Sequence, residues 1–206
     1  MKLHNIFHND LPPEMGFQGS IAIDTEAMGL NIIRDRLCLV QISDSEQNVY
    51  FVKFDGTDYS APNLKKVLED QTLLKIFHYA RFDVAILCHY LKIEKMSPIF
   101  CTKIASKLVR TYTDFHGLKT ICKELLNVEL EKESQSSYWG AKHLSDKQKK
   151  YAANDVIHLH QIKEILENRL KEQGRMEIAQ SFFDTLHIVC KCDVLGFDAA
   201  SILNHH

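Results

Sequence analysis

Several features that would assign a protein to a special class are missing from this chain. None of its apolar runs reaches the roughly 18 residues of a membrane span, and the opening "MKLHNIFHNDLPPEMG" has no apolar core of signal-peptide length. The six cysteines are scattered rather than spaced as a disulfide framework, which is typical of reduced thiols. Internal repeats, low-complexity stretches and a domain-sized linker are also missing. These absences predict a cytoplasmic protein that does not interact with a membrane and that forms one domain over residues 1–206.

The chain also has no excess of basic residues. Its 25 Lys and Arg residues are set against 27 Asp and Glu residues, and the formal net charge is −2. A long duplex bound through an overall positive field is therefore excluded. If the partner is a nucleic acid, it must be held locally by a few cations or metal ions, which favours a short substrate.

The alternation of apolar segments predicts an α/β domain with a mixed sheet. The expected strands lie at about 20–24, 36–43, 48–54 and 73–78, with a brief fifth strand after Pro98. The first three follow one another over short connections, so we expect an antiparallel opening. The expected helices lie at 61–70, 80–91, 117–126, 145–173 and about 175–190, with one more directly after the fifth strand. Ser145 is suited to cap the long helix at 145–173, and Gly174 separates that helix from the last one.

Two carboxylates, Asp24 and Glu26, lie two positions apart at the end of the first expected strand, in "IAIDTEAMGL". Side chains two apart on a strand point to the same face, and two like charges side by side are unfavourable without a partner. Either a cation lies between them or they are solvated at the strand end.

Two further carboxylates lie on expected helices. Asp83 is early in "ARFDVAILCHYL", and Asp155 follows Tyr151 by four residues, which places both on one helix face. Each alone is a weak signal, because an Asp in a first helical turn commonly compensates the helix dipole. Together with Asp24 and Glu26, they would supply the hard oxygen ligands of a two-metal phosphodiesterase site holding Mg²⁺ or Mn²⁺.

The order and spacing of "DTE", "FHYARFD" and "YAANDV" resemble the three exonuclease motifs of the DEDD superfamily, in the tyrosine-bearing (DEDDy) branch that includes RNase D. The resemblance covers roughly residues 18–170 and includes "QSSYW" at 135–139. It implies a ribonuclease H-like fold, with a mixed five-stranded sheet flanked by helices. It also implies metal-dependent hydrolysis from 3′ to 5′ that releases nucleoside 5′-monophosphates, with Asp24, Glu26, Asp83 and Asp155 as metal ligands and Tyr151 as a catalytic residue.

Within this branch, the segments "RDRLCLVQIS", "KIFHYARFDVAIL" and "FCTKIASKLVRTYTDFHGLK" are similar to the bacterial nano-RNase C (NrnC) family over almost the whole chain. This resemblance implies cleavage of very short RNAs, especially dinucleotides, and assembly into homo-octamers. Two departures from the RNase D pattern favour the narrower family. Only about fifty residues follow Asp155, and Cys101 stands where RNase D usually has an aspartate.

Two other functions remain open at this point. One is a broader RNase D-like exonuclease that trims longer RNA or DNA ends, and short DNA is likewise open as a substrate. The other is a catalytically silent nucleic-acid-binding scaffold, although a scaffold has no reason to keep a costly cluster of like charges.

The roles of the residues around the motifs have competing interpretations. Tyr151 either orients the attacking water or packs against the helix. Leu30 either resembles the wedge that separates two bases in oligoribonuclease-type enzymes or is an ordinary core leucine. His78 either binds a phosphate or ends the strand, and Trp139 either buttresses the site or stacks on a base.

Three basic residues, Lys103, Lys107 and Arg110, recur at helical spacing. They form either a solvated helix face or a substrate entrance. In the apolar segment 174–206, Cys190 and Cys192 are interpreted as ordinary thiols of an apolar segment rather than as a soft-metal site with His187. That segment is too apolar for solvent, and we expect it to be helical and to serve in homo-oligomerisation.

Overall fold

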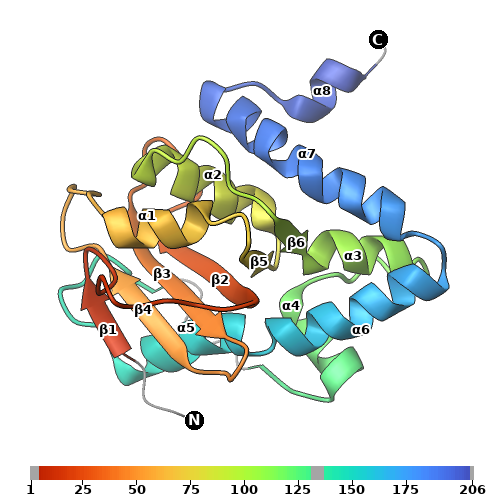
Figure 1. Cartoon of the computed structure of the whole chain (residues 1–206), viewed down its shortest axis with the longest axis horizontal. Helices are drawn as coiled ribbons and strands as arrows, with labels where there is room; N and C mark the ends of the chain where they lie inside the picture. The colour runs from red at the N-terminus through yellow and green to blue at the C-terminus, as the bar shows by residue number, and fades with distance from the viewer. Residues whose placement is uncertain (1–4, 131–136, 205–206) are drawn as a thin grey trace.

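The structure is a computed structural model that describes residues 5–130 and 137–204. Its described strands form one mixed sheet in the order β1-β4-β3-β2-β5-β6 (Figure 1). The strands are β1 (Asn5–His8), β2 (Ser20–Ala27), β3 (Leu37–Asp44), β4 (Val49–Lys53), β5 (Leu74–Phe77) and β6 (Ile99–Cys101). β3 pairs antiparallel with β2 and β4, which confirms the antiparallel opening, and the other neighbours are parallel.

The sheet has six strands among the described residues rather than the expected five. The additional strand is β1, which pairs in parallel with β4 along the sheet edge. Its four residues, "NIFH", carry no recognisable alternation, because only Ile6 and Phe7 are partly buried. The pairing of a short edge strand with a partner about 45 positions later is a tertiary contact that local pattern cannot predict.

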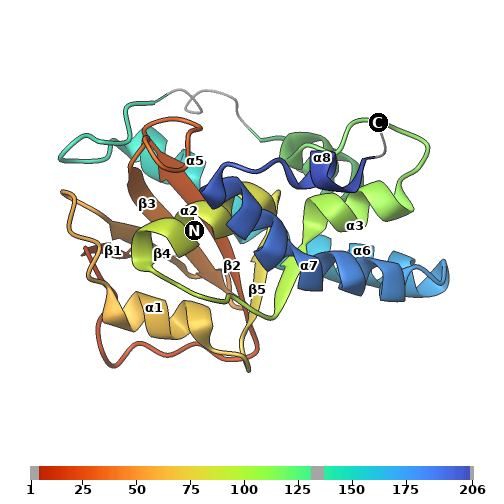
Figure 2. The ribbon, with the colours of Figure 1, turned by 90° about the horizontal axis from the view of Figure 1, so that it is seen from above.

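Helices cover both faces of the sheet. Figure 2 shows α1 (Pro62–Glu69) and α5 (Asp146–Ile157) on opposite sides of it, with α2 (Ala80–Leu91) on the side of α1. The remaining helices are α3 (Thr102–Val109), the short α4 (Leu118–Ile121), α6 (Leu159–Glu172), α7 (Met176–Leu195) and α8 (Ala199–Leu203). α5 packs on β2, β3 and β4, so side chains of α5 and of these three strands meet on that face of the sheet.

Local sequence explains where several of these elements begin and end. β3 is buried along almost its whole length, as a continuous apolar run requires. Pro62 occupies the start of α1, where a missing N–H costs nothing. Ser145 caps α5, because its side-chain oxygen accepts a hydrogen bond from the Gln148 backbone N–H. The Gln148 side-chain oxygen in turn accepts from the Ser145 backbone N–H, and the two bonds form a capping box.

Two expected helices differ in the structure. The stretch 145–173 is divided at His158 into α5 and α6, because α5 lies on the sheet whereas α6 packs along α3. The stretch 117–126 begins as α4 and continues as a π-helical turn at Cys122–Leu126. Gly174, with a φ of 64°, does separate α6 from α7, as the sequence indicates.

Helix α7 lies against α2, α3, α6 and β6 (Figure 1). Arg81 in the first turn of α2 forms a two-pronged ion pair with Asp193 of α7, at 2.7 and 2.6 Å. The rings of Phe100 and Phe183 pack with their centroids 4.8 Å apart. Cys190 of α7 is buried with a free thiol. Among the described helices, none is both long enough and apolar enough to cross a bilayer.

Candidate active site

Strand β2 and helix α5 bring three carboxylates together. Asp24 and Glu26 project from one face of β2, and Asp155 approaches from α5, which packs on that face. One carboxylate oxygen from each of the three lies within 4.8 Å of the other two. The strand spacing and the helix motif that the sequence analysis singled out therefore meet at one place.

Asp83 lies beside this group and is not one of its three members in the described part of the chain. It is buried in the first turn of α2, and its Oδ1 accepts a 2.6 Å hydrogen bond from the Thr25 hydroxyl. Thr25 lies between Asp24 and Glu26 on β2 and points to the opposite face of the sheet. A single strand thus links all the motif carboxylates except Asp155.

The carboxylates are held in an environment that disfavours their charge. Burial raises the pKa of Asp24 well above its ordinary value, and the charges of Asp83, Asp155 and Glu26 raise it further. Burial, followed by the charges of Asp155 and Asp83, raises the pKa of Glu26 to about 9. Burial raises the pKa of Asp83 to about 7, and also that of Asp155. Such a cluster is costly to fold without a cation, and perturbed carboxyls of this kind gather at functional sites.

Sequence reasoning missed two polar residues that support the cluster. Gln41 is directly opposite Asp24 on β3 and donates to its Oδ2 at 3.2 Å, while the Gln41 Oε1 has no partner among the described residues. Thr25 is the other, through Asp83. Gln41 was visible in the sequence as a polar residue inside the apolar run "RLCLVQIS", but its role depends on the β2–β3 register.

Tyr151 of α5 borders the cluster from the same helix as Asp155. Its hydroxyl is hydrogen-bonded to Asp155, and burial together with the nearby carboxylates raises the pKa of the phenol far above its ordinary value. A phenol in this setting remains protonated, so it can orient a water but not act as a base. Trp139 is 2% exposed, and its ring centroid lies 6.1 Å from that of Tyr151. Its indole N–H has no partner within the described residues.

The loop after β2 carries an exposed leucine. The β2–β3 register shifts after Glu26, and the chain leaves the sheet through residues 28–36. Bulges of this kind are common beside active sites, where they redirect side chains. Leu30 is 86% exposed, which excludes the interpretation as an ordinary core leucine. Its use as a wedge between bases remains a prediction.

His78 and Lys103 lie where β5 leads into α2 and β6 into α3. His78 is partly buried, and its Nδ1 lies 2.9 Å from the Thr102 hydroxyl. Burial, helped by the charge of Lys103, lowers the pKa of His78 to about 3, so the imidazole is neutral. The Lys103 ammonium lies 4.0 Å from the centroid of the Tyr79 ring, and Tyr79 is 49% exposed with a φ of 70°.

The three predicted basic residues do not form a single stripe. Lys107 is exposed on α3, but Arg110 is completely buried after its end. The Arg110 guanidinium donates to the Glu124 carboxylate, the Ser106 hydroxyl and the Phe115 carbonyl. Helical spacing alone could not distinguish this residue, which holds α3 to the following turn, from its exposed neighbours.

The donor set of the cluster fits a hard divalent cation. Its three converging atoms are carboxylate oxygens, which are the ligands that Mg²⁺ and Mn²⁺ prefer. Burial and the neighbouring carboxylates dominate the raised pKa values of Asp24 and Glu26, so a bound cation would relieve the repulsion.

A sequence model described as 3′–5′ exonuclease matches residues 8–171. The chain belongs to the 3′–5′ exonuclease family. Within it, this exonuclease is 32% identical over 157 residues to ribonuclease D of Gluconacetobacter diazotrophicus, a match that covers 76% of the chain and 39% of that relative. The chain therefore spans about two fifths of the length of this curated relative. The predicted membership of the 3′–5′ exonuclease family, in the RNase D superfamily, is confirmed.

Solved structures place the exonuclease more narrowly. Brucella melitensis NrnC bound to pGG is 45% identical, with a TM-score of 0.92 and 98% of each chain covered, and the same protein with bound Mg²⁺ gives 0.93 over 100% of each chain. Escherichia coli RNase D, 24% identical with a TM-score of 0.74 over 84% of this chain and 45% of its own, shares the fold. The predicted ribonuclease H-like fold and the closeness to NrnC are both confirmed.

Proposed function

We propose that this protein is a metal-dependent exoribonuclease that hydrolyses short oligoribonucleotides, especially dinucleotides, from the 3′ end and releases nucleoside 5′-monophosphates. The observation that carries the proposal is the convergence of Asp24, Glu26 and Asp155 within 4.8 Å, with Asp83 adjacent. The 45% identity to an NrnC solved with pGG supports the short substrate.

The carboxylates of the cluster and Tyr151 would have different roles in the reaction. Asp24, Glu26 and Asp155 would hold divalent cations, with Asp83 completing the ligand set from α2. Two such ions would lower the pKa of the attacking water and neutralise charge on the phosphate. Tyr151 keeps its proton and would orient that water through its hydroxyl, with Asp155 fixing the phenol.

The substrate would be recognised by apolar and polar groups around the cluster. Leu30 is free to insert between two bases, which requires no reading of their edges. Tyr79 with Lys103 offers a second aromatic surface with a cation over it. Trp139, buried against Tyr151, buttresses the site rather than stacking on a base. The neutral His78 would contribute a hydrogen bond and not a charge. Lys107 on the exposed side of α3 would attract the phosphates from solvent.

The proposal includes assembly into a homo-octamer. Its support in the molecule is helix α7, where Ile178, Phe182, Ile188 and Leu195 are all at least half exposed. Apolar side chains in such number indicate a protein contact. Light scattering at micromolar concentration should return a mass near eight chains, and a stable monomer would contradict the assembly.

The test is a time course on 5′-labelled RNAs of two to seven nucleotides, with Mg²⁺ or Mn²⁺ and with a chelator. We expect the dinucleotide to be cleaved fastest and the chelator to stop cleavage of every length. Equal rates for two and seven nucleotides would favour the broader exonuclease. Parallel reactions on a deoxydinucleotide determine whether short DNA is also a substrate.

A further inference from the structure

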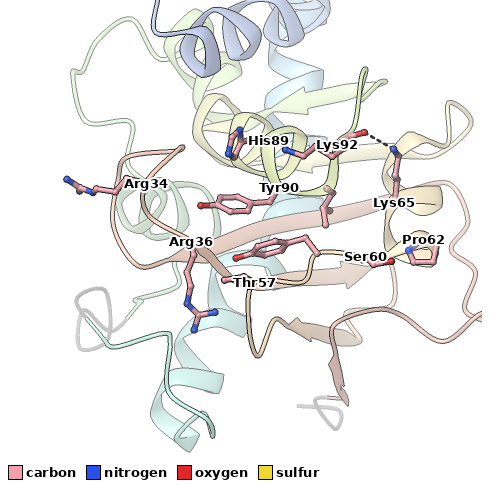
Figure 3. A pocket seen from close by; sticks show the side chains of 12 residues that line it. Arg34, Arg36, Thr57, Ser60, Pro62, Lys65, His89, Tyr90 and Lys92 are labelled. Carbon is pink, nitrogen blue, oxygen red and sulfur yellow. Dashed lines mark hydrogen bonds between the residues drawn. The ribbon is translucent and has the colours of Figure 1, made fainter.

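A second concave surface lies on the α1 and α2 side of the sheet. This cavity of about 890 Å³ is formed by the end of the β2–β3 loop, the segment before α1, the start of α1 and the end of α2 (Figure 3). We refer to it as the tyrosine groove, after Tyr59 and Tyr90, which line it. Ligand sites in proteins commonly have volumes of about 300–1,000 Å³. None of the proposed metal ligands lines this groove, and α5, which carries Asp155, covers the opposite face of the sheet (Figure 2).

The aromatic part of the groove is held rigidly. The rings of Tyr59 and Tyr90 have centroids 4.5 Å apart with their planes inclined at 49°. Tyr59 is fixed by a 2.9 Å hydrogen bond from its hydroxyl to the Leu37 carbonyl and by packing against Phe54. Tyr90 packs edge-on against His89. Partly exposed aromatic rings held in this way provide a stacking surface whose ordering cost is already met by the fold.

Cations surround these rings on both sides. In Figure 3, Arg34 and Arg36 lie to one side of Tyr90, and Lys65 and Lys92 lie to the other. The Arg36 guanidinium donates to the Gly56 carbonyl at 3.1 Å, and Lys65 donates to the Lys92 carbonyl at 2.6 Å.

The positive charge of the groove is only partly neutralised. Asp35 pairs with Arg34, and Glu69 lies 3.7 Å from Lys65. In the part of the chain that the structure describes, Arg36 and Lys92 have no carboxylate partner, and no Asp or Glu lines the groove. In a chain whose net charge is −2, such a local excess of positive charge selects an anionic ligand.

We infer that the tyrosine groove binds a nucleotide, with the base on Tyr59 and Tyr90 and the phosphate on Lys92 and the neighbouring Lys65, which lie on the same side of the rings. Stacking on tyrosine suits every base, and arginine and lysine are the usual partners of phosphate. An acidic peptide would leave the rings unused, and an uncharged sugar would leave the cations unused. The site stands apart from the carboxylate cluster, so it does not depend on the proposed hydrolysis.

Calorimetric titration of the full chain with adenosine 5′-monophosphate tests this inference. Chelator is present throughout, so that nothing is hydrolysed. The variants are Lys92→Glu, which changes an exposed side chain, and Tyr90→Ala. Lys66→Glu is the matched control, because Lys66 is an exposed lysine of α1 that does not line the groove. Arg36 is left intact because it also contacts the Gly140 carbonyl beside Trp139.

We expect binding to weaken at least about tenfold in Lys92→Glu and Tyr90→Ala, the scale of one lost stacking or charged contact. It should be unchanged in Lys66→Glu and in Asp24→Asn. Circular dichroism confirms that each variant folds, and if Tyr90→Ala does not, Lys92→Glu decides alone. Equal weakening in Lys92→Glu and Lys66→Glu would overturn the inference. Loss of binding in Asp24→Asn would place the nucleotide at the carboxylates and would also overturn it.

Three further titrations, with adenosine, inorganic phosphate and a dinucleotide, test the chemistry of the ligand. Adenosine and inorganic phosphate should each bind much more weakly than adenosine 5′-monophosphate, and equal affinity for either would refute recognition of a nucleotide. A dinucleotide that binds more tightly, with the same dependence on Lys92, would identify the occupant as a unit of a chain. Equal affinities would identify it as a free mononucleotide. Failure to bind the monophosphate while RNA cleavage persists would remove this inference and leave the proposed function intact.

Discussion

The two faces of the sheet treat charge in opposite ways. On the α5 face, Asp24, Glu26 and Asp155 are brought together in a partly buried setting where burial and mutual repulsion raise their pKa values. On the α1 and α2 face, the tyrosine groove keeps its cations near solvent and spaces them around two rings. The first arrangement costs folding free energy unless a cation joins it, whereas exposed lysines and arginines cost little. This nearly neutral chain therefore separates its charges locally, with a carboxylate cluster on one face of the sheet and a group of cations on the other.

The largest effect on activity is expected from substitutions that remove the negative charges of the carboxylate face. Asp24→Asn, Glu26→Gln, Asp83→Asn or Asp155→Asn should each lower dinucleotide turnover by about 10²–10³-fold or more, because each removes a charged ligand. Steady-state assays with the exposed Asp114→Asn as control measure this effect. Retention of most activity in any one of the four, in a folded protein, would show that the ligand set is misassigned.

Leu30 lies on the loop 28–36, which begins just after Glu26 of the carboxylate cluster and includes Arg34 and Arg36 of the tyrosine groove. Leu30→Ala should slow dinucleotide turnover by roughly ten- to a hundredfold, which corresponds to the 1–3 kcal/mol of a lost stacking contact. The nearby Ile33→Ala, also an exposed apolar residue of this loop, is the matched control. An unchanged rate in Leu30→Ala would show that no wedge operates there.

Tyr151→Phe sharpens the comparison, because it removes a hydroxyl but no charge from the α5 face. We expect a loss of about tenfold, milder than for any carboxylate variant, since the ligands of the cations remain. The effect should fall on kcat rather than on KM. A loss as large as that of Asp155→Asn would instead assign the phenol a direct part in metal binding.

The smallest effect is expected on the pH dependence of the stability of the metal-free protein. The pKa values of Asp83 and Asp155 are about 7 and that of Glu26 about 9, so the folded state binds more protons than the unfolded state from about pH 4 upward. The free energy of unfolding should therefore fall as the pH rises from about 4 to 9. Asp24→Asn should flatten this profile and raise Tm at pH 8 by about 2–4 °C for each kcal/mol of repulsion relieved. Thermal melts in chelator at pH 5.5 and 8 measure the difference, and parallel profiles would refute it.

The sequence predicted the residues of the carboxylate cluster better than it predicted the residues that surround the cluster. The two-residue spacing of Asp24 and Glu26 is a strand property, so it could be read without a fold, and Tyr151 and Asp155 share a helix face by spacing alone. That Asp83 belongs to the same place came from the resemblance of three ordered motifs. Ser145 as a cap and Gly174 as a break were likewise local signals, and both are confirmed.

What could not be predicted depends on tertiary contacts. Gln41 reaches Asp24 only because β2 and β3 pair in one register, and Thr25 reaches Asp83 only because the fold brings the first turn of α2 to β2. Arg110 has the spacing of an exposed residue but is buried by the turn that follows α3. The tyrosine groove joins residues from positions 34 to 92 and has no motif of its own. Of the segment "QSSYW", residues 135 and 136 lie outside the described residues.

The central claim, that the carboxylate cluster exists to hold divalent cations, is tested most directly by titrating the metal-free protein with Mn²⁺ and following bound ion by electron paramagnetic resonance. The wild type and Asp114→Asn should bind two ions per chain, and Asp24→Asn should lose most of this binding. Mn²⁺ binding that is the same in Asp24→Asn and in the wild type would contradict the account.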